Sequence, residues 1–282
     1  MAGVSPDPLA PLVGLPGVAD AVRRAREAVV ALHRHPVNRT GWAASAAEAA
    51  LRAARASAAL DGAELARADG VVTDPVLAGA VRAAEATGRL LGTWRTAPLQ
   101  ALARLHVLAA ADLGAAYPAA GLGASDVAGA HGAAAVSGAH GTSAVSGAAG
   151  AGDSAGAPGR PVRGTERLAL LAELVTGGTS VPAPVLVAVV HGELLVLEPF
   201  ASANGVVARA AARLAAISSG LDPRGLAVPE VGHLRAGAAY RDAARGFATG
   251  TPEGLAAWIR HCCDQWVMGA REGRSIADAR AK

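Results

Sequence analysis

Apolar residues recur every three or four positions over several long stretches of the chain. Between Val18 and Leu32 they alternate with Arg23, Arg24 and Glu27, which fall on other faces. This spacing is typical of an amphipathic α-helix. Similar spacing, together with residues typical of helix starts and ends, predicts further helices over 45–62, 74–91, 96–112, 165–175, 206–218 and 251–269. The pattern therefore predicts an all-α protein.

Local signals suggest where two of these helices begin and end. Ser45 and Glu48 have the spacing of a capping box and predict a helix start, with an end near Gly62. Thr251 followed by proline predicts the start of the last helix, and Gly269 predicts its end.

The most apolar stretch leaves two structures open. Val185–Val190 and Glu193–Leu197 could be two strands joined by a two-residue turn at His191 and Gly192. The same run could equally be one buried helix, because apolar periodicity alone does not separate these structures.

Composition narrows the class of protein. Hydrophobic residues make up 52% of the 282 residues but aromatic residues only 3%, and alanine fills the difference. Alanine favours helices, which argues against an all-β sandwich. No secretory signal precedes the first helix, and no apolar run reaches the roughly 20 residues of a bilayer span. We expect a cytoplasmic protein without a membrane partner.

Charge and cysteine content exclude further classes. The net charge is +3, and the basic residues are scattered without a run of five or six, which argues against a nucleic-acid partner. Cys262 and Cys263 are adjacent, which excludes a disulfide scaffold and a four-cysteine zinc site. His261 precedes them, but no second ligand pair has metal-site spacing, so we expect buried thiols and no metal. We also expect Trp42 and Trp94 in the core.

A low-complexity segment divides the chain. Residues 113–160 are rich in Gly, Ala and Ser and contain a tandem repeat, GAHGAAAVS at 129–137 and GAHGTSAVS at 138–146. Such a segment buries too little apolar surface to offset its ordering entropy, so we expect a disordered insertion. The expected organisation is an N-terminal helical region over 1–95, a core over 96–270 interrupted by the insertion, and a tail over 271–282.

The stretch 198–209, EPFASANGVVAR, carries the strongest chemical signal. Asn204 and Gly205 form a turn immediately before a predicted helix. The first amides of a helix have no internal partners and, with the helix dipole, favour a bound anion such as phosphate. Asn204 could add a donor to this site. The alternative is an ordinary turn at a helix start.

This stretch resembles the signature loop of Fic (Fido-fold) proteins, H-P-F-x-[DE]-G-N-G-R-x-x-R. Pro199, Phe200, Asn204, Gly205 and Arg209 match it in register. The resemblance covers most of the chain except the insertion. It implies a helical Fido fold with an N-terminal helical extension, and protein adenylyltransfer (AMPylation) from ATP with Mg²⁺ onto a target protein.

A second match lies far from the first in sequence. Ser57 to Gly62 resembles the inhibitory helix motif [ST]-x-x-x-E-[GN] of self-restrained Fic proteins, with Asp61 in place of Glu. The resemblance implies that this carboxylate pairs with Arg209 and blocks the space of a nucleotide γ-phosphate. The alternative is a helix end at which Asp61 faces water.

The departures from the signature affect the chemistry. Glu198 stands where the family has its catalytic His, Ser202 where it has the acidic residue that holds Mg²⁺, and Val206 where it has the first Arg. A solvated Glu has a pKa of about 4.3, which is low for a base that abstracts an alcohol proton. A hydroxyl binds Mg²⁺ weakly, so Mg²⁺ is not expected.

We therefore expect a degenerate Fic-like protein that keeps an anion pocket for a phosphate, ATP or another nucleotide. Its residues would be Ser202, Asn204, Gly205 and Arg209. Two alternatives remain open. One is an active adenylyltransferase or related transferase with an altered base, restrained by the N-terminal helix; the other is a non-enzymatic module that binds a regulatory protein. The resemblance further implies that Glu198, Asn204, Arg209 and Asp61 border one cleft.

Overall fold

The computed structural model describes residues 7–65, 74–114 and 159–282. Within these ranges all regular structure is helical, which confirms the all-α prediction. The expected disordered insertion lies almost entirely outside the described ranges, as do both copies of the nine-residue repeat.

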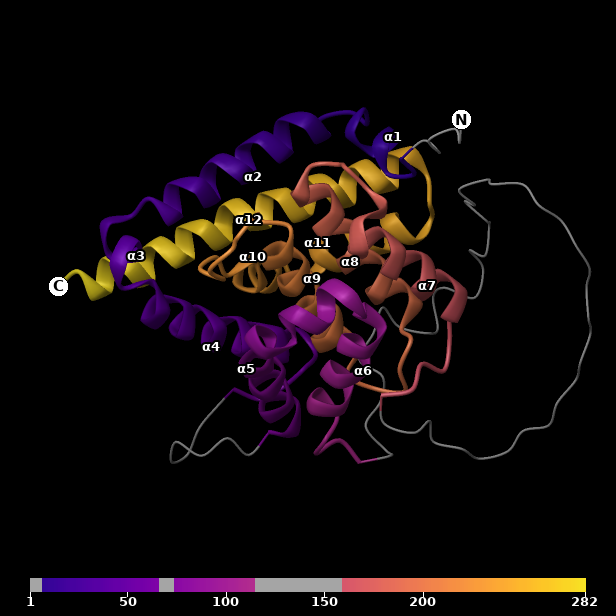
Figure 1. Ribbon diagram of the computed structural model, residues 1–282, viewed down its shortest axis with the longest axis horizontal. Coiled ribbons are helices and arrows are strands. Elements are labelled where there is room, and N and C mark those ends of the chain that lie inside the picture. Colours follow the sequence, from indigo (N-terminus) through magenta and orange to yellow (C-terminus); the bar gives the residue numbers. More distant parts are fainter. Residues whose placement is uncertain (1–6, 66–73, 115–158) are drawn as a thin grey trace, which may run out of the picture.

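The described ranges contain twelve α-helices and one π-helical turn (Figure 1). Their bounds are α1 Ala10–Val13, α2 Val18–His33, α3 Pro36–Thr40, α4 Trp42–Leu60, α5 Pro75–Thr96, α6 Pro98–Ala109, α7 Thr165–Glu173, η1 Leu174–Gly178, α8 Ala183–Leu197, α9 Asn204–Ser218, α10 Pro229–Ala236, α11 Ala238–Ala248 and α12 Pro252–Arg280.

None of the described helices is both long enough and apolar enough to span a membrane.

The last helix is the longest and lies beside the first long one. α12 and α2 run side by side across the molecule in Figure 1, and α12 also contacts α8, α10 and α11. The face of α2 toward the core carries Val18, Ala21, Val22, Ala25, Val29 and Leu32, the spacing predicted from sequence. Burying a Val or Leu side chain contributes about 1.5–3 kcal/mol, so this face holds α2 in place.

Two helices, α8 and α9, lie at the centre of the molecule and pack on each other. The segment with two open interpretations is the single helix α8, not a hairpin, and ten of its fifteen residues are buried. A helix surrounded by other helices can be apolar on every face, which removes the periodicity that would have identified it. Gly192 allows the close approach of α12, because a Cβ there would lie 2.7 Å from Trp258 Nε1.

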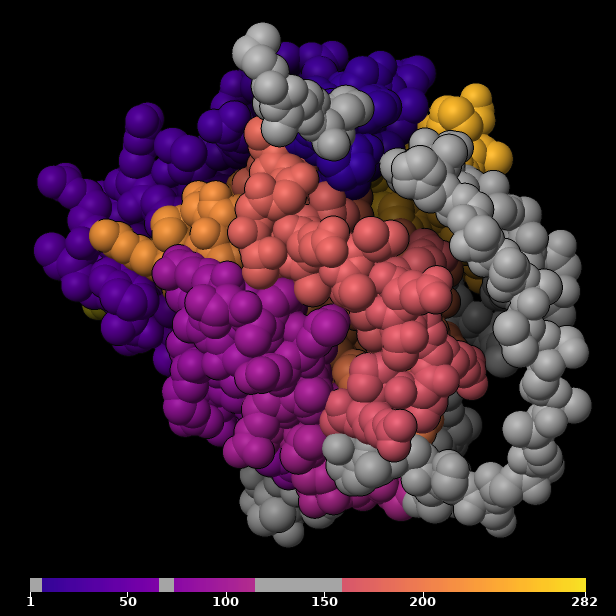
Figure 2. Space-filling model, turned by 45° about the vertical axis from the view of Figure 1, so that its right-hand side comes forward, coloured from indigo at the N-terminus to yellow at the C-terminus, as the bar shows by residue number. Residues whose placement is uncertain are grey.

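Figure 2 shows the face on which residues of α5 and α6 lie beside those of α7, in agreement with the contact between α6 and α7. His106 of α6 stacks on Phe200 in the loop between α8 and α9. Val162, just before α7, donates its backbone N–H to the Pro199 carbonyl at 2.7 Å, so the chain after the insertion is attached to this loop.

Three boundary predictions were wrong. α4 begins at Trp42, so Ser45 lies inside the helix, buried and without a capping bond, while Glu48 pairs with Arg52. α5 continues past Leu91 to Thr96. α12 passes through Gly269 and makes residues 271–280 helical instead of a tail.

Gly269 lies inside α12 because the start of α10 packs directly against it. A Cβ at this position would lie 2.5 Å from the Pro229 backbone nitrogen, so glycine allows the start of α10 to touch α12.

Of the two tryptophans predicted in the core, Trp94 is fully buried, but Trp42 is 39% exposed, with the Arg224 guanidinium 5.7 Å from its ring centre. Cys262 and Cys263 are buried thiols, as expected.

Candidate functional site

The loop between α8 and α9 contains both non-glycine residues with positive φ in the described part of the chain. They are Glu198, which ends α8 with φ 42°, and Ala203, which precedes α9 with φ 55°. A left-handed backbone at a residue with a Cβ costs about 1–2 kcal/mol and persists only where the surroundings fix it. The loop is therefore held in a defined and strained shape.

Asn204 fixes that shape. Its Oδ1 accepts the Phe200 backbone N–H at 2.9 Å, and its Nδ2 donates to the Phe200 carbonyl at 2.8 Å. Phe200 is held in turn by stacking on His106, with ring centres 4.3 Å apart. Both polar atoms of the Asn204 side chain thus bind the loop backbone, and its role as a donor to a ligand stays a prediction.

The carboxylate of Asp61 occupies the start of α9. It accepts the backbone N–H of Val206, and its Oδ1 lies 2.6 Å from Arg209 Nη2. A Cβ at Gly205 would lie 2.4 Å from Oδ1 and 2.6 Å from Oδ2. Glycine is therefore needed for this approach, and the free amide end of α9 holds an anion that belongs to the protein. The alternative in which Asp61 faces water was wrong, since its side chain is 8% exposed.

Arg209 is bound by α4 at several points. Its Nε donates to Ser57 Oγ at 2.8 Å, and its Nη2 donates to the Ser57 carbonyl at 2.9 Å as well as to Asp61. Ser57 and Asp61 are one turn apart on α4, so both face the same guanidinium. The structure thus unites Ser57, Asp61, Gly205 and Arg209, which the sequence placed in two motifs.

The end of α4 sets the position of Asp61. Gly62 has φ 87° and follows Asp61 directly. The Ala63 N–H donates to the Ala58 carbonyl and the Gly62 N–H to the Ala59 carbonyl, both close to 3 Å. This is the Schellman arrangement, in which a left-handed glycine ends the helix. Asp61 therefore sits on the last ordered turn of α4 and does not fray into solvent.

Asp61 and Arg209 form a buried ion pair, with side chains 8% and 3% exposed. Burial raises the pKa of the Asp61 carboxyl, while Arg209 and the Val206 amide oppose that shift. Burial acts against the charged form of Arg209, but the Asp61 carboxylate outweighs it and raises the pKa of the guanidinium. Coulomb attraction at this separation is strong in a poorly solvated site, so each charge depends on the other.

A cluster of neutral rings lies behind the pair. Tyr240 Oη is 2.9 Å from His191 Nε2 and 3.5 Å from Arg209 Nη1, and His233 Nδ1 is 3.2 Å from His261 Nε2. Burial lowers the pKa of His191 and His233 well below 6.5 and raises the pKa of Tyr240 to about 12. These rings come from α8, α10, α11 and α12, and no local sequence pattern joins them, so their contact was not predictable from the sequence.

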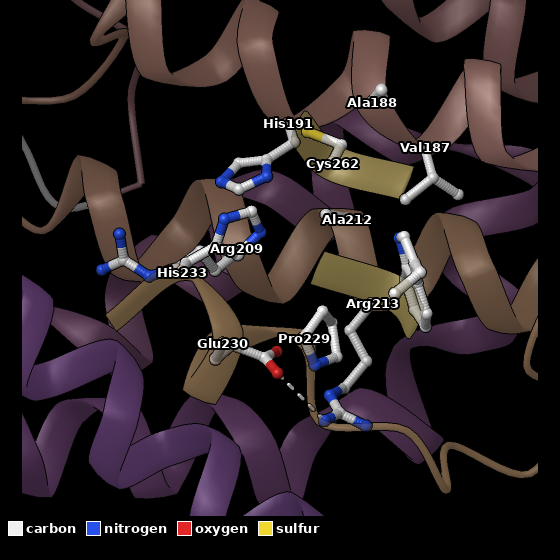
Figure 3. Close-up of a pocket in the computed structure, with 11 residues that line it drawn as sticks. Val187, Ala188, His191, Arg209, Ala212, Arg213, Pro229, Glu230, His233 and Cys262 are labelled. Carbon is white, nitrogen blue, oxygen red and sulfur yellow. Dashed lines mark hydrogen bonds and ion pairs between the residues drawn. The ribbon is translucent and has the colours of Figure 1, made fainter. Parts of the chain in front are cut away.

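The space beside this cluster is small. A cavity of about 20 Å³ is lined by His191, Arg209, Arg213, Glu230 and His233, among others (Figure 3). It has room for about one water molecule. Arg213 makes an ion pair with Glu230 at 3.4 Å, drawn as the dashed line, and donates to the Gly225 and Ala227 carbonyls. That arginine therefore holds the chain between α9 and α10.

The remaining signature positions lie around the same loop. Ser202 is half-buried, Glu198 is half-buried at the end of α8, and Val206 is buried in the core. Among the described residues no three or more His, Cys, Asp or Glu side chains are grouped as a metal site.

No family model, curated protein or solved structure matches this chain.

Proposed function

We propose that the chain is a Fic-like domain with a Fido-type helical fold that has lost AMP-transfer chemistry and keeps an anion pocket at the start of α9. The pocket consists of the first amides of α9, Gly205 and Arg209. In the conformation described here, Asp61 occupies it. A nucleotide phosphate or another phosphate group would bind in place of the Asp61 carboxylate.

One observation carries this proposal. The carboxylate of Asp61 binds both the Val206 amide and Arg209, although it comes from a helix 148 positions earlier in the chain. A carboxylate and a phosphate oxygen take the same donors, since both are anions that accept charge-assisted hydrogen bonds. Aspartate is one methylene shorter than the glutamate of the family motif. Because Gly205 has no Cβ, the Asp61 carboxylate can still approach the start of α9 closely.

The positions around the pocket lack groups that AMP transfer needs. Val206, in place of an arginine, is buried in the core and offers no charge to a phosphate. Ser202 offers Mg²⁺ only a neutral hydroxyl, and Glu198 ends α8 in a left-handed conformation. Phosphoryl-type transfer depends on positioned charge, and three of the groups that would supply it are absent.

The test is to remove the internal anion. Asp61→Ala leaves Arg209 buried without its partner, which costs about 3–5 kcal/mol. Sodium triphosphate or ATP should then raise the melting temperature of Asp61→Ala far more than that of the wild type, because the added anion restores the missing charge. Differential scanning fluorimetry and isothermal titration calorimetry measure the two effects.

Asp242→Ala is the matched control, because Asp242 is an exposed carboxylate on α11 that pairs with Arg245. It should show no anion-dependent stabilisation beyond the wild type. Equal responses of Asp61→Ala and Asp242→Ala to triphosphate and ATP would refute the proposed pocket.

An active transferase is the second candidate. The observation that favours it is that one side chain, Asp61, occupies the pocket, so a single substitution could expose it. Asp61→Gly protein would be incubated with labelled ATP and cell lysate, alone and combined with Glu198→His. Transfer of label to a lysate protein supports an enzyme, and absence of label in both proteins leaves the binding function alone.

A further inference from the structure

A second basic site lies at the other end of α9. His33 and Arg34 end α2, Arg39 lies on α3, and Arg224 follows α9; together they line an open hollow of about 480 Å³. α3, labelled beside the C-terminal end of α12 in Figure 1, marks this region. α9 has 15 residues and is about 22 Å long, so the hollow is well separated from Asp61 at its start.

The guanidinium groups that line this hollow have no carboxylate partner among the described residues. Neither Arg34 nor Arg39 forms an ion pair with any described residue, and both are exposed. Arg224 donates to a backbone carbonyl, that of Asn38, at 2.6 Å. Three like charges that face one hollow repel each other, so the arrangement is unfavourable until an anion enters.

The carboxylate nearest to Arg224 in the sequence, that of Asp222, already has other hydrogen-bond partners. Asp222 is 1% exposed; its Oδ1 accepts from His33 Nε2 at 2.7 Å and from the Leu226 amide, and its Oδ2 accepts from the Ala227 amide. Asp222 therefore fixes His33 and the loop after α9 and leaves the guanidinium groups unneutralised.

Part of the site is held in position before any ligand arrives. The bond from Arg224 to Asn38 and the bond from His33 to Asp222 tie the loop after α9 to α2 and α3. Arg224 also lies over the ring of Trp42, which restricts it further. Arg34 and Arg39 remain free to close on a ligand from the solvent side, and preorganisation of the other two groups lowers the cost of binding.

We propose that this hollow binds a small anion with two or more phosphate groups. Guanidinium groups form bidentate bonds with phosphate oxygens, and their fixed fork suits phosphate better than a monovalent anion. The hollow is open to solvent, and its volume of about 480 Å³ leaves room for a triphosphate or a nucleotide. This site is additional to the anion pocket at α9 and does not depend on it.

The test uses the full chain with Asp61 intact, so that the α9 pocket stays occupied. Sodium triphosphate and ATP are titrated into the wild type and into Arg34→Ala/Arg39→Ala by calorimetry, with sodium sulfate at matched ionic strength as the comparison anion. Loss of two charge-assisted contacts should weaken triphosphate binding roughly tenfold or more. Binding should also weaken as salt is added.

Arg89→Ala is the control, because Arg89 is an exposed arginine on α5 without a described ion pair. It should bind triphosphate like the wild type. Arg39→Glu, which reverses one charge, should weaken binding further than Arg39→Ala. Circular dichroism checks that these surface variants fold.

The two ligands identify what is recognised. Equal affinity for triphosphate and ATP assigns recognition to the phosphates, and tighter binding of ATP adds a nucleoside contact; both support the site if they are lost in the double variant. Equal binding of triphosphate by the wild type and the double variant, or no binding by the wild type, overturns the proposal, whatever the Asp61 variants do.

Discussion

Asp61 shows how the position of a single carboxylate depends on several local features. It is the last residue before the glycine that ends α4, and Gly205 leaves the space that it enters. The family resemblance predicted its pairing with Arg209, and the 2.6 Å contact agrees. Asn204 directly follows the strained Ala203, and its side chain bonds the Phe200 backbone and so holds the loop in shape.

The strain at Ala203 gives a prediction at this scale. Ala203 has φ 55°, where a Cβ costs about 1 kcal/mol relative to glycine. Ala203→Gly should therefore raise the free energy of unfolding by up to about 1 kcal/mol, as measured by urea denaturation. Ala210→Gly, inside α9, should lower it by a similar amount. A loss of stability in Ala203→Gly would show that the loop does not impose this strain.

At the scale of the elements, glycines inside helices have different roles that sequence signals do not separate. The sequence pattern predicts a helix end at Gly269, yet α12 continues to Arg280. The glycine is needed there because the start of α10 packs against α12 at this position. The capping-box spacing predicts a helix start at Ser45, yet α4 starts three residues earlier at Trp42. For Gly269 a contact with another helix decided what the local pattern left ambiguous.

Gly269→Ala tests this explanation through the sign of its effect. An added Cβ would meet the Pro229 nitrogen at 2.5 Å, and such overpacking costs about 1–3 kcal/mol. Gly88→Ala on α5 is the control, since nothing lies within 4 Å of its Cβ position and alanine is the better helix former. Thermal unfolding should show a lower melting temperature for Gly269→Ala and a higher one for Gly88→Ala. A gain in both would mean that α10 can move away at little cost.

Across the whole molecule, the buried rings link stability to pH. His191 and His233 come from different helices, and burial lowers the pKa of both below the 6.5 of an exposed histidine. Below pH 6.5 the unfolded chain therefore binds more protons than the folded one, and stability is lost as pH falls.

The free energy of unfolding should fall between pH 7.5 and pH 5.5, by up to about 1.4 kcal/mol per pH unit for each histidine that remains neutral in the fold. Urea denaturation at several pH values measures the slope. His233→Gln should reduce it, because one of the two neutral rings is removed. A stability that is constant or rises toward pH 5.5 would contradict the neutral, buried state of these rings.

The sequence by itself determined the helical class, the amphipathic face of α2, the burial of Trp94 and both cysteines, and two motifs that hold the residues of the candidate site. These follow from periodicity, composition and short-range spacing, which act within one element. The tertiary structure decided between the alternatives left open for the 183–197 run and for Asp61, and it alone showed that Arg34, Arg39 and Arg224 line one hollow. Each of those outcomes depends on contacts between segments that lie far apart in the chain. A pattern within one segment carries no information about which distant segment it will contact.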